Sequence, residues 1–374
     1  MALMRFDFWF RRASLATGLV IVYVFLMTGF NIWKPRVLIL HSFSQSLRLV
    51  KDTDAGMREA LSVNRMPISV RWYYLNRDRN DVESMGNAEL TGAERVINSF
   101  NPTVIVAVNN QANLVLSHYP YLHRDRLVFF LGNSRPALKF GYSSKTGVAG
   151  IEATPPFLAL AQLFAVIRPA GGLRIVALGT NTPRGRDTAE GITTFQWGPQ
   201  RLVASDLIDT WPQWQAAVLR ANQQADILLI TAIYGVHRSP NGPLVPAEEV
   251  VRWTEAHSKK ALPVGLIGDY VPLGGSLGVF PSAHYLGAMA MESVLKWLDP
   301  SNKRVPPIIP KDDHFDIGLR EVSLRSRGLQ LPLVYREAAR LSGQLNPVEG
   351  VPAASNPAAT NPAATISGSQ NPVR

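Results

Sequence analysis

Short apolar runs alternate with amphipathic segments along most of the chain. The runs 104–108, 127–131 and 226–231 have the length of buried strands, whereas the segments between such runs repeat their apolar residues at helical spacing. Strands that alternate with helices in this way are typical of parallel sheets joined by crossover helices. The pattern therefore predicts an α/β protein.

A turn-rich stretch at 143–148 interrupts the alternation, which then resumes. The predicted strands lie at 37–41, 68–75, 104–108, 127–131, 174–178, 202–205, 226–231 and 263–267. The predicted helices lie at 47–63, 89–100, 155–167, 185–195, 211–224, 246–259 and 283–297, and one more includes 113–117. Two successive α/β series joined by a short segment indicate two similar Rossmann-like lobes, each with a parallel sheet.

The last long helix affects the lobe boundaries, because the amphipathic segment at 283–297 should return to the first lobe. The first lobe would then comprise residues 35–145 and about 282–310, and the second 146–281 and about 311–335. Residues 345–374 are mainly Pro, Ala, Asn, Ser and Gly, with Asn-Pro-Ala-Ala-Thr occurring twice. Such a segment cannot bury a core and is predicted to be a disordered tail.

A longer apolar run, Leu15–Trp33, lies a few residues before the first predicted strand. Its 19 residues approach the roughly 20 that a helix needs to span a bilayer, and Arg5, Arg11 and Arg12 precede it. Because positive flanking charge stays cytoplasmic, residues 1–34 are expected to form a single-pass inner-membrane anchor, with a cytoplasmic N-terminus and a periplasmic main domain. A cleaved signal peptide is the alternative, but the run ends in a poor cleavage site.

Composition narrows the function classes. The net charge is +10, but the basic residues are scattered without a run of five, so nucleic-acid binding is not expected. The chain has no cysteine, which excludes disulfides, cysteine nucleophiles, Fe–S ligation and a lipid-modified cysteine anchor. No H-E-x-x-H or P-loop motif occurs, and no nucleophile–base pair can be picked out. The acidic and histidine residues of 311–316 are interpreted as an exposed strand entry. We therefore expect no catalysis, metal or cofactor.

Polar side chains follow most of the predicted strands, and parallel sheets bind ligands beyond the carboxyl ends of their strands. The candidate ligand-binding residues are Ser42, Phe43, Asn109, Asn110, Asn133, Thr182, Arg184, Tyr234 and Asp269. Phe43 and Tyr234 would stack on a ligand, Arg184 would clamp a carboxylate and Asp269 would bind an ammonium group. Each is also an ordinary loop or capping residue, so the cleft is predicted from the joint pattern.

Several segments resemble one known family. They are 37–43 (Val-Leu-Ile-Leu-His-Ser-Phe), 101–108 (Asn-Pro-Thr-Val-Ile-Val-Ala-Val), 146–148, 268–275 (Gly-Asp-Tyr-Val-Pro-Leu-Gly-Gly) with Ser282 and Gly287 beyond it, and 314–332. These segments resemble the ABC-type periplasmic substrate-binding proteins of an uncharacterised group related to tryptophan and tyrosine binders. The same module occurs as an extracellular sensor domain. The resemblance covers roughly residues 36–335 and implies a type I periplasmic-binding-protein fold with a hinge.

The function expected from this resemblance is that of a membrane-anchored, extracytoplasmic solute-binding protein. Its lobes would close on a small organic solute, with amino acids among the candidates, and it would serve a permease or a sensor protein. Residues 15–33 would contact the bilayer. The loop 179–184 lacks the acidic start often seen in the family, which puts the usual ligand in doubt. The alternative is a non-catalytic accessory subunit that docks on a membrane complex and has a degenerate cleft.

Overall fold

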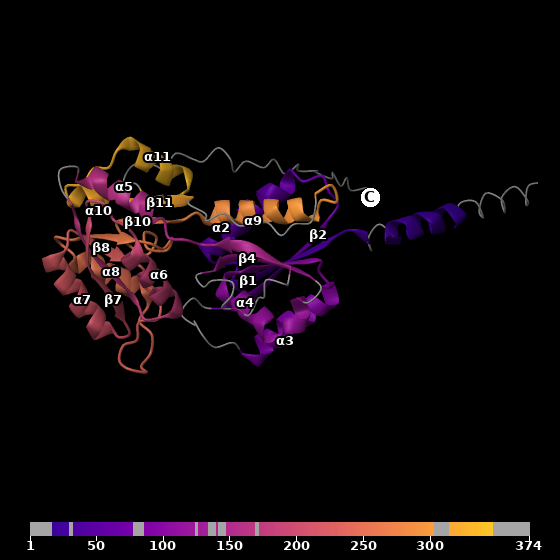
Figure 1. The fold of residues 1–374 in the computed structure, drawn as a ribbon, viewed down its shortest axis with the longest axis horizontal. Coiled ribbons are helices and arrows are strands. Elements are labelled where there is room, and N and C mark those ends of the chain that lie inside the picture. Colours follow the sequence, from indigo (N-terminus) through magenta and orange to yellow (C-terminus); the bar gives the residue numbers. More distant parts are fainter. Residues whose placement is uncertain are drawn as a thin grey trace, which may run out of the picture.

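The computed structural model describes residues 17–29, 33–77, 86–123, 126–133, 140, 147–168, 172–302 and 314–346. Two α/β lobes lie side by side (Figure 1). The predicted α/β class, the parallel sheets and the division into two lobes are confirmed.

The first lobe is built on a five-stranded parallel sheet in the order β2-β1-β3-β4-β5. Its strands are β1 (Arg36–Phe43), β2 (Ser69–Arg77), β3 (Val104–Val108), β4 (Leu127–Asn133) and β5 (Val148–Glu152). Its helices are α2 (Arg48–Ser62), α3 (Asn87–Phe100), α4 (Asn109–His118), the 3-10 turn η1 (Pro120–His123) and α9 (Ala283–Leu298). Alternate residues of β1 pack against α2 and α9 on one face and against α3 and α4 on the other.

The second lobe is built on a seven-stranded sheet in the order β12-β11-β10-β9-β8-β6-β7. Its strands are β6 (Arg174–Thr180), β7 (Arg201–Ile208), β8 (Ile227–Ile230), β9 (Leu262–Gly265), β10 (Leu277–Pro281), β11 (Phe315–Arg320) and β12 (Leu345–Asn346). Its helices are α5 (Phe157–Ile167), α6 (Pro183–Thr194), α7 (Trp211–Gln224), α8 (Ala247–His257), α10 (Glu321–Ser326) and α11 (Leu333–Leu341). Among the described pairings of this sheet, β10 with β11 is antiparallel and the others are parallel.

Three local predictions need correction. The expected start of the second lobe at residue 146 is too early, because β5 pairs with β4 and so belongs to the first sheet. The helix expected around 113–117 already begins at Asn109, which leaves no loop after β3. Strand β10 was not predicted, since Leu-Gly-Val-Phe-Pro is short and contains two weak strand formers.

The N-terminal run is helical over residues 17–29 and projects away from the two lobes (Figure 1). Its large apolar side chains are exposed, with Phe25 reaching 78%. Within the described residues, no helix has the combined length and apolarity that crossing a bilayer requires. Residues 15, 16 and 30–32 of the predicted span lie outside the described residues, as does the predicted tail from residue 347 onward.

Helices α2 and α9 meet backbone to backbone through two glycines. A Cβ atom on Gly56 would overlap the carbonyl oxygen of His284, and one on Gly287 would overlap that of Thr53. The reciprocal contact brings a helix that follows directly from β10 of the second lobe onto the first lobe. A methyl group at either position would force the two helices apart.

We predict that Gly56→Ala lowers the free energy of unfolding by about 2–3 kcal/mol, because backbone atoms cannot move aside as a flexible side chain can. Gly92→Ala is the matched control, since the new Cβ would meet the hydroxyl end of Tyr73, 2.7 Å away before relaxation. The control should stay close to wild type, helped by the higher helix propensity of alanine. Thermal or urea unfolding measures both; equal losses would contradict the packing argument.

A buried polar network fixes α2 on the sheet. His41, at the end of β1, is fully buried, and its Nε2 lies 2.7 Å from Oδ1 of Asp54 on α2. The Tyr74 hydroxyl on β2 donates a 2.6 Å hydrogen bond to the other carboxylate oxygen. Burial raises the pKa of Asp54, but the close contact with His41, the hydrogen bond from Tyr74 and the charge of Arg58 outweigh it and leave the pKa below its ordinary value.

Asp54→Asn should therefore destabilise the protein by about 1–3 kcal/mol at pH 7, because the amide offers a donor where both neighbours need an acceptor. Asp206→Asn removes a carboxylate from an exposed pair with Arg220 and should change stability by less than about 0.5 kcal/mol. Urea or thermal unfolding of both variants measures the two losses of stability. Equal losses for Asp54→Asn and Asp206→Asn would show that the buried network stabilises the protein no more than an exposed ion pair does.

Candidate ligand-binding cleft

A cleft of about 780 Å³, counted with its open mouth, lies between the two lobes. The first lobe contributes Arg48, Asp52 and Asn109 to its lining, and the second lobe contributes Asp269, Phe280 and Asp316. Ala153 and Pro281, beside the two described crossings between the lobes, also line it. The cleft therefore reaches the connections about which the lobes would move.

The sequence-predicted residues gather mainly in an adjoining space of about 640 Å³. Its lining includes Phe43, Asn109, Asn110, Thr182, Arg184 and Tyr234. Asp269 lines the larger space, and Asn109 and Arg184 line both. The strand-end rule thus brings residues from both lobes together, although the side chain of Asn133 lies outside what the structure describes.

Ser42 is placed differently from the prediction, because its side chain is buried inside the first lobe. Its hydroxyl donates a 2.6 Å hydrogen bond to the carbonyl oxygen of Val108 and accepts one of 3.0 Å from the backbone N–H of Ala112. Ser42 therefore joins the end of β3 to the first turn of α4, and it lines neither part of the cleft.

Asn109 owes its position to an unusual backbone. It has a φ of 67°, which lets β3 turn directly into α4 without a loop. Asparagine is among the few residues other than glycine that adopt this conformation readily. On the neighbouring strand, Gly132 leaves just enough room, since a Cβ there would lie 3.2 Å from Oδ1 of Asn109. The amide is thereby held at the carboxyl edge of the sheet.

In the second lobe, the polar groups of the cleft are fixed by their neighbours. The Tyr234 hydroxyl donates a 2.5 Å hydrogen bond to Oδ2 of Asp269. Thr182 caps α6 by accepting a 3.1 Å hydrogen bond from the N–H of Gly185, and Arg184 follows in the first turn of that helix. These contacts hold the tyrosine and the start of α6 at the edge of the cleft.

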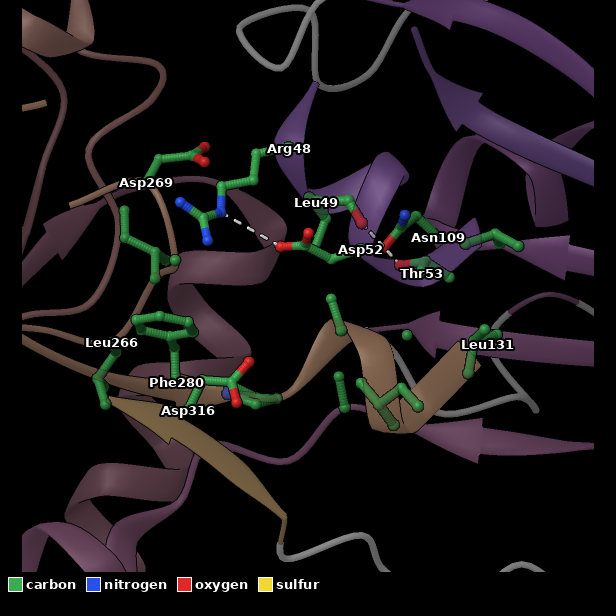
Figure 2. A pocket seen from close by; sticks show the side chains of 18 of the residues that line it. Arg48, Leu49, Asp52, Thr53, Asn109, Leu131, Leu266, Asp269, Phe280 and Asp316 are labelled. Atoms are coloured by element: carbon green, nitrogen blue, oxygen red, sulfur yellow. Dashed lines mark hydrogen bonds and ion pairs between the residues drawn. The ribbon is translucent and has the colours of Figure 1, made fainter. Parts of the chain in front are cut away.

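The sequence prediction missed charged residues that come from other elements. Arg48 on α2 pairs with Asp52 at 3.3 Å, and its guanidinium donates to the carbonyl oxygens of Ser342 and Gly343 at 3.1 and 2.8 Å. These last bonds connect the first lobe to the end of α11 in the second. In Figure 2 Arg48 points toward the loop that carries Asp269, whereas Asp316 lies with Phe280 on the other side. An acidic or basic residue in a helix carries no sequence signal for such a role.

Asp316 is a carboxyl group of the cleft whose surroundings shift its pKa. Burial raises the pKa of Asp316, and the negative charge of Asp52 raises it further. A hydrogen bond with Ser282 lowers the pKa, but the net result lies above the ordinary value of 3.8. The charged carboxylate therefore costs stability at neutral pH, and this cost disappears as the pH falls through the raised pKa toward 3.8.

Replacing Asp316 by asparagine should accordingly leave the protein as stable as wild type at pH 7, or more stable by up to about 1 kcal/mol. The difference should shrink as the pH falls through the raised pKa, and it should vanish only below 3.8, where the unfolded state also carries a neutral carboxyl group. Melting temperatures of both proteins measured between pH 3.5 and pH 7.5 test this. A marked loss at pH 7 would show that the carboxylate makes net favourable contacts in the folded state.

The pattern G-x-S-x-G, which surrounds the nucleophilic serine of many hydrolases, occurs at Gly274–Gly278. The surroundings of its serine differ from those of a nucleophile. Ser276 is fully buried, donates a 2.6 Å hydrogen bond to Glu255, and precedes a strand rather than a helix. Tyr270 is equally buried and donates to the same carboxylate at 3.1 Å. In the described part of the chain, no group of three or more acidic or histidine side chains is arranged to hold a metal ion.

Comparison with known proteins places this geometry in context. No protein-family model matches the chain, and no curated protein does. Among solved structures, a ligand-free, open substrate-binding protein with adhesive properties from Clostridium difficile is 14% identical, with a TM-score of 0.60 over 80% of this chain and 96% of that one. The fold is that of the substrate-binding proteins. The resemblance suspected from the sequence is confirmed at this level.

Two further structures agree. A conserved domain protein from Vibrio cholerae is 12% identical, with a TM-score of 0.55 over 82% of this chain and 98% of that one. An ABC domain in complex with L-Trp from Streptococcus pneumoniae is 14% identical, with a TM-score of 0.53 over 83% and 100% of the two chains. At such identities the likeness establishes the fold, and the ligand of this chain has to be argued from its own residues.

Proposed function

We propose that this protein is a non-catalytic, extracytoplasmic solute-binding protein whose lobes close on a small organic ligand, for an ABC transporter or a sensor. One observation carries the proposal: charged and polar side chains from both lobes line a single cleft beside the crossings between the lobes. The substrate-binding fold supports it.

The mechanism follows from the position of these groups. A ligand that contacts Asn109 in the first lobe and Arg184 or Tyr234 in the second favours the closed arrangement over the open one by its difference in affinity. The preformed bond between Tyr234 and Asp269 reduces the ordering that binding requires. Closure changes the outer surface of both lobes, and this surface is what a permease or sensor would recognise.

A screen of solute classes on the full-length protein tests the proposal. At 100 times its dissociation constant, a true ligand should add about 2.7 kcal/mol of stability. Arg184→Ala should abolish most of that gain, because Arg184 lines every part of the cleft. Arg220→Ala, which removes an exposed guanidinium paired with Asp206, should leave the gain intact. The absence of any stabilising solute, together with stoichiometric copurification in a membrane complex, would favour the accessory-subunit alternative.

We further propose that the N-terminal segment is an uncleaved inner-membrane anchor that holds the lobes in the periplasm. Nine consecutive apolar residues, 19–27, are exposed on a helix that projects away from the two lobes (Figure 1). Basic residues precede this helix in the sequence. Leaving this much apolar surface in water is unfavourable, whereas a bilayer would cover it.

Val22→Arg should therefore shift the protein from the membrane pellet to the supernatant after an alkaline carbonate wash, because a charge near the centre of the segment costs about 2.5–3.5 kcal/mol on insertion. Val203→Arg, at an exposed apolar position of β7, is the matched control and should stay in the pellet. N-terminal sequencing of the wild type completes the test. A mature protein that starts near residue 30 would show a cleaved signal peptide.

A further inference from the structure

The cleft has a charge opposite to that of the whole chain. The chain carries a net +10, yet the charged residues that line the larger space are three carboxylates, Asp52, Asp269 and Asp316, and two guanidinium groups, those of Arg48 and Arg184. The lining therefore has one negative charge in excess. A basic protein that gathers acidic groups in its ligand cleft favours a cation there and repels an anion.

A second observation concerns hydrogen bonding. The side chain of Gln344 lines the same space, is 4% exposed, and its Oε1 has no hydrogen-bond partner in the described structure. The backbone of Gln344 is satisfied, since its N–H donates to Ala339 and its carbonyl accepts from Leu319. A buried acceptor without a donor costs free energy that a donor from a ligand would recover. Carboxylates, likewise, are acceptors only.

Two of the carboxylates that line this space, those of Asp52 and Asp316, come from opposite lobes. Asp52 projects from α2 of the first lobe, and Asp316 from β11 of the second, and the two charges repel each other. Arg48 carries one positive charge against these two negative charges, and its guanidinium also donates to the carbonyl oxygens of Ser342 and Gly343. Bringing the lobes together without a ligand would increase this repulsion, so the unliganded protein is biased toward the open state.

We propose that the ligand is an organic amine whose ammonium group binds between Asp52 and Asp316, with Gln344 as a further acceptor, and that neutralising the two carboxylates drives closure. This inference rests on the proposed solute-binding function. An ammonium group supplies three donors and one positive charge, which matches the acceptors and the excess charge of the lining. The ring of Phe280 lies beside Asp316 (Figure 2) and offers an aromatic surface that also attracts ammonium. The apolar body of the amine would pack on Leu266 and Leu286.

The test uses two series of probes. Within each series the carbon skeleton is similar, and the charged groups on it change from cation to zwitterion to anion. One comprises tryptamine, L-tryptophan and indole-3-propionate, and the other putrescine, 4-aminobutanoate and succinate. Calorimetric titration of the full-length protein at pH 7.5 should give the tightest binding for the cation of at least one series, weaker binding for the zwitterion, and none for the anion. Asp316→Asn and Asp52→Asn should each weaken binding of that cation by about tenfold or more. Asp206→Asn should not change it.

The outcomes separate the two proposals. An anion or zwitterion that binds as tightly as the cation, or a cation that binds equally well to Asp316→Asn, would overturn the amine assignment while leaving solute binding in place. Failure of every probe in both series would also overturn it, and solute binding would then be judged by the wider screen. Melting curves of each variant confirm that lost binding is not lost folding.

Discussion

The close backbone contact between α2 and α9 is the constraint on which the cleft depends. Glycines at 56 and 287 allow the two helices to touch, and α9 enters this contact directly from β10 of the second lobe. The first turn of α9 and the cleft-facing side of α2 are thereby fixed against each other, and Ala283 and Leu286 line the cleft together with Asp52 and Thr53. A wider helix crossing would displace the charged face of α2 from the hinge side of the cleft.

The first lobe adds a second restraint through the buried contact of Asp54 with His41 and Tyr74, which ties α2 to the sheet. Arg48 then connects the same helix to the end of α11 in the other lobe. Helix α2 thus contacts the sheet and α9 in the first lobe and, through Arg48, the end of α11 in the second lobe.

The candidate site was partly predictable, because ligands of parallel sheets bind at the carboxyl ends of strands whatever the side chains. That rule found Phe43, Asn109, Arg184 and Asp269, which do line the cleft. It included Ser42 wrongly, since a hydroxyl after a strand can equally be used inside the fold. It missed Asp316 and Gln344, which come from an antiparallel strand and from the turn before β12, where no such rule applies.

The class of fold could be predicted from the amino-acid sequence, because apolar periodicity and the order of strands and helices are local properties of the chain. The sequence also determined the apolar N-terminal run and the strand ends at which a cleft would form. The three-dimensional structure was needed to show that β5 belongs to the first sheet, that α9 meets α2 through glycine, and that Asp52 and Asp316 lie on opposite sides of the cleft (Figure 2). Those facts depend on pairings between residues far apart in the chain, and the spacing of residues along the sequence does not contain them.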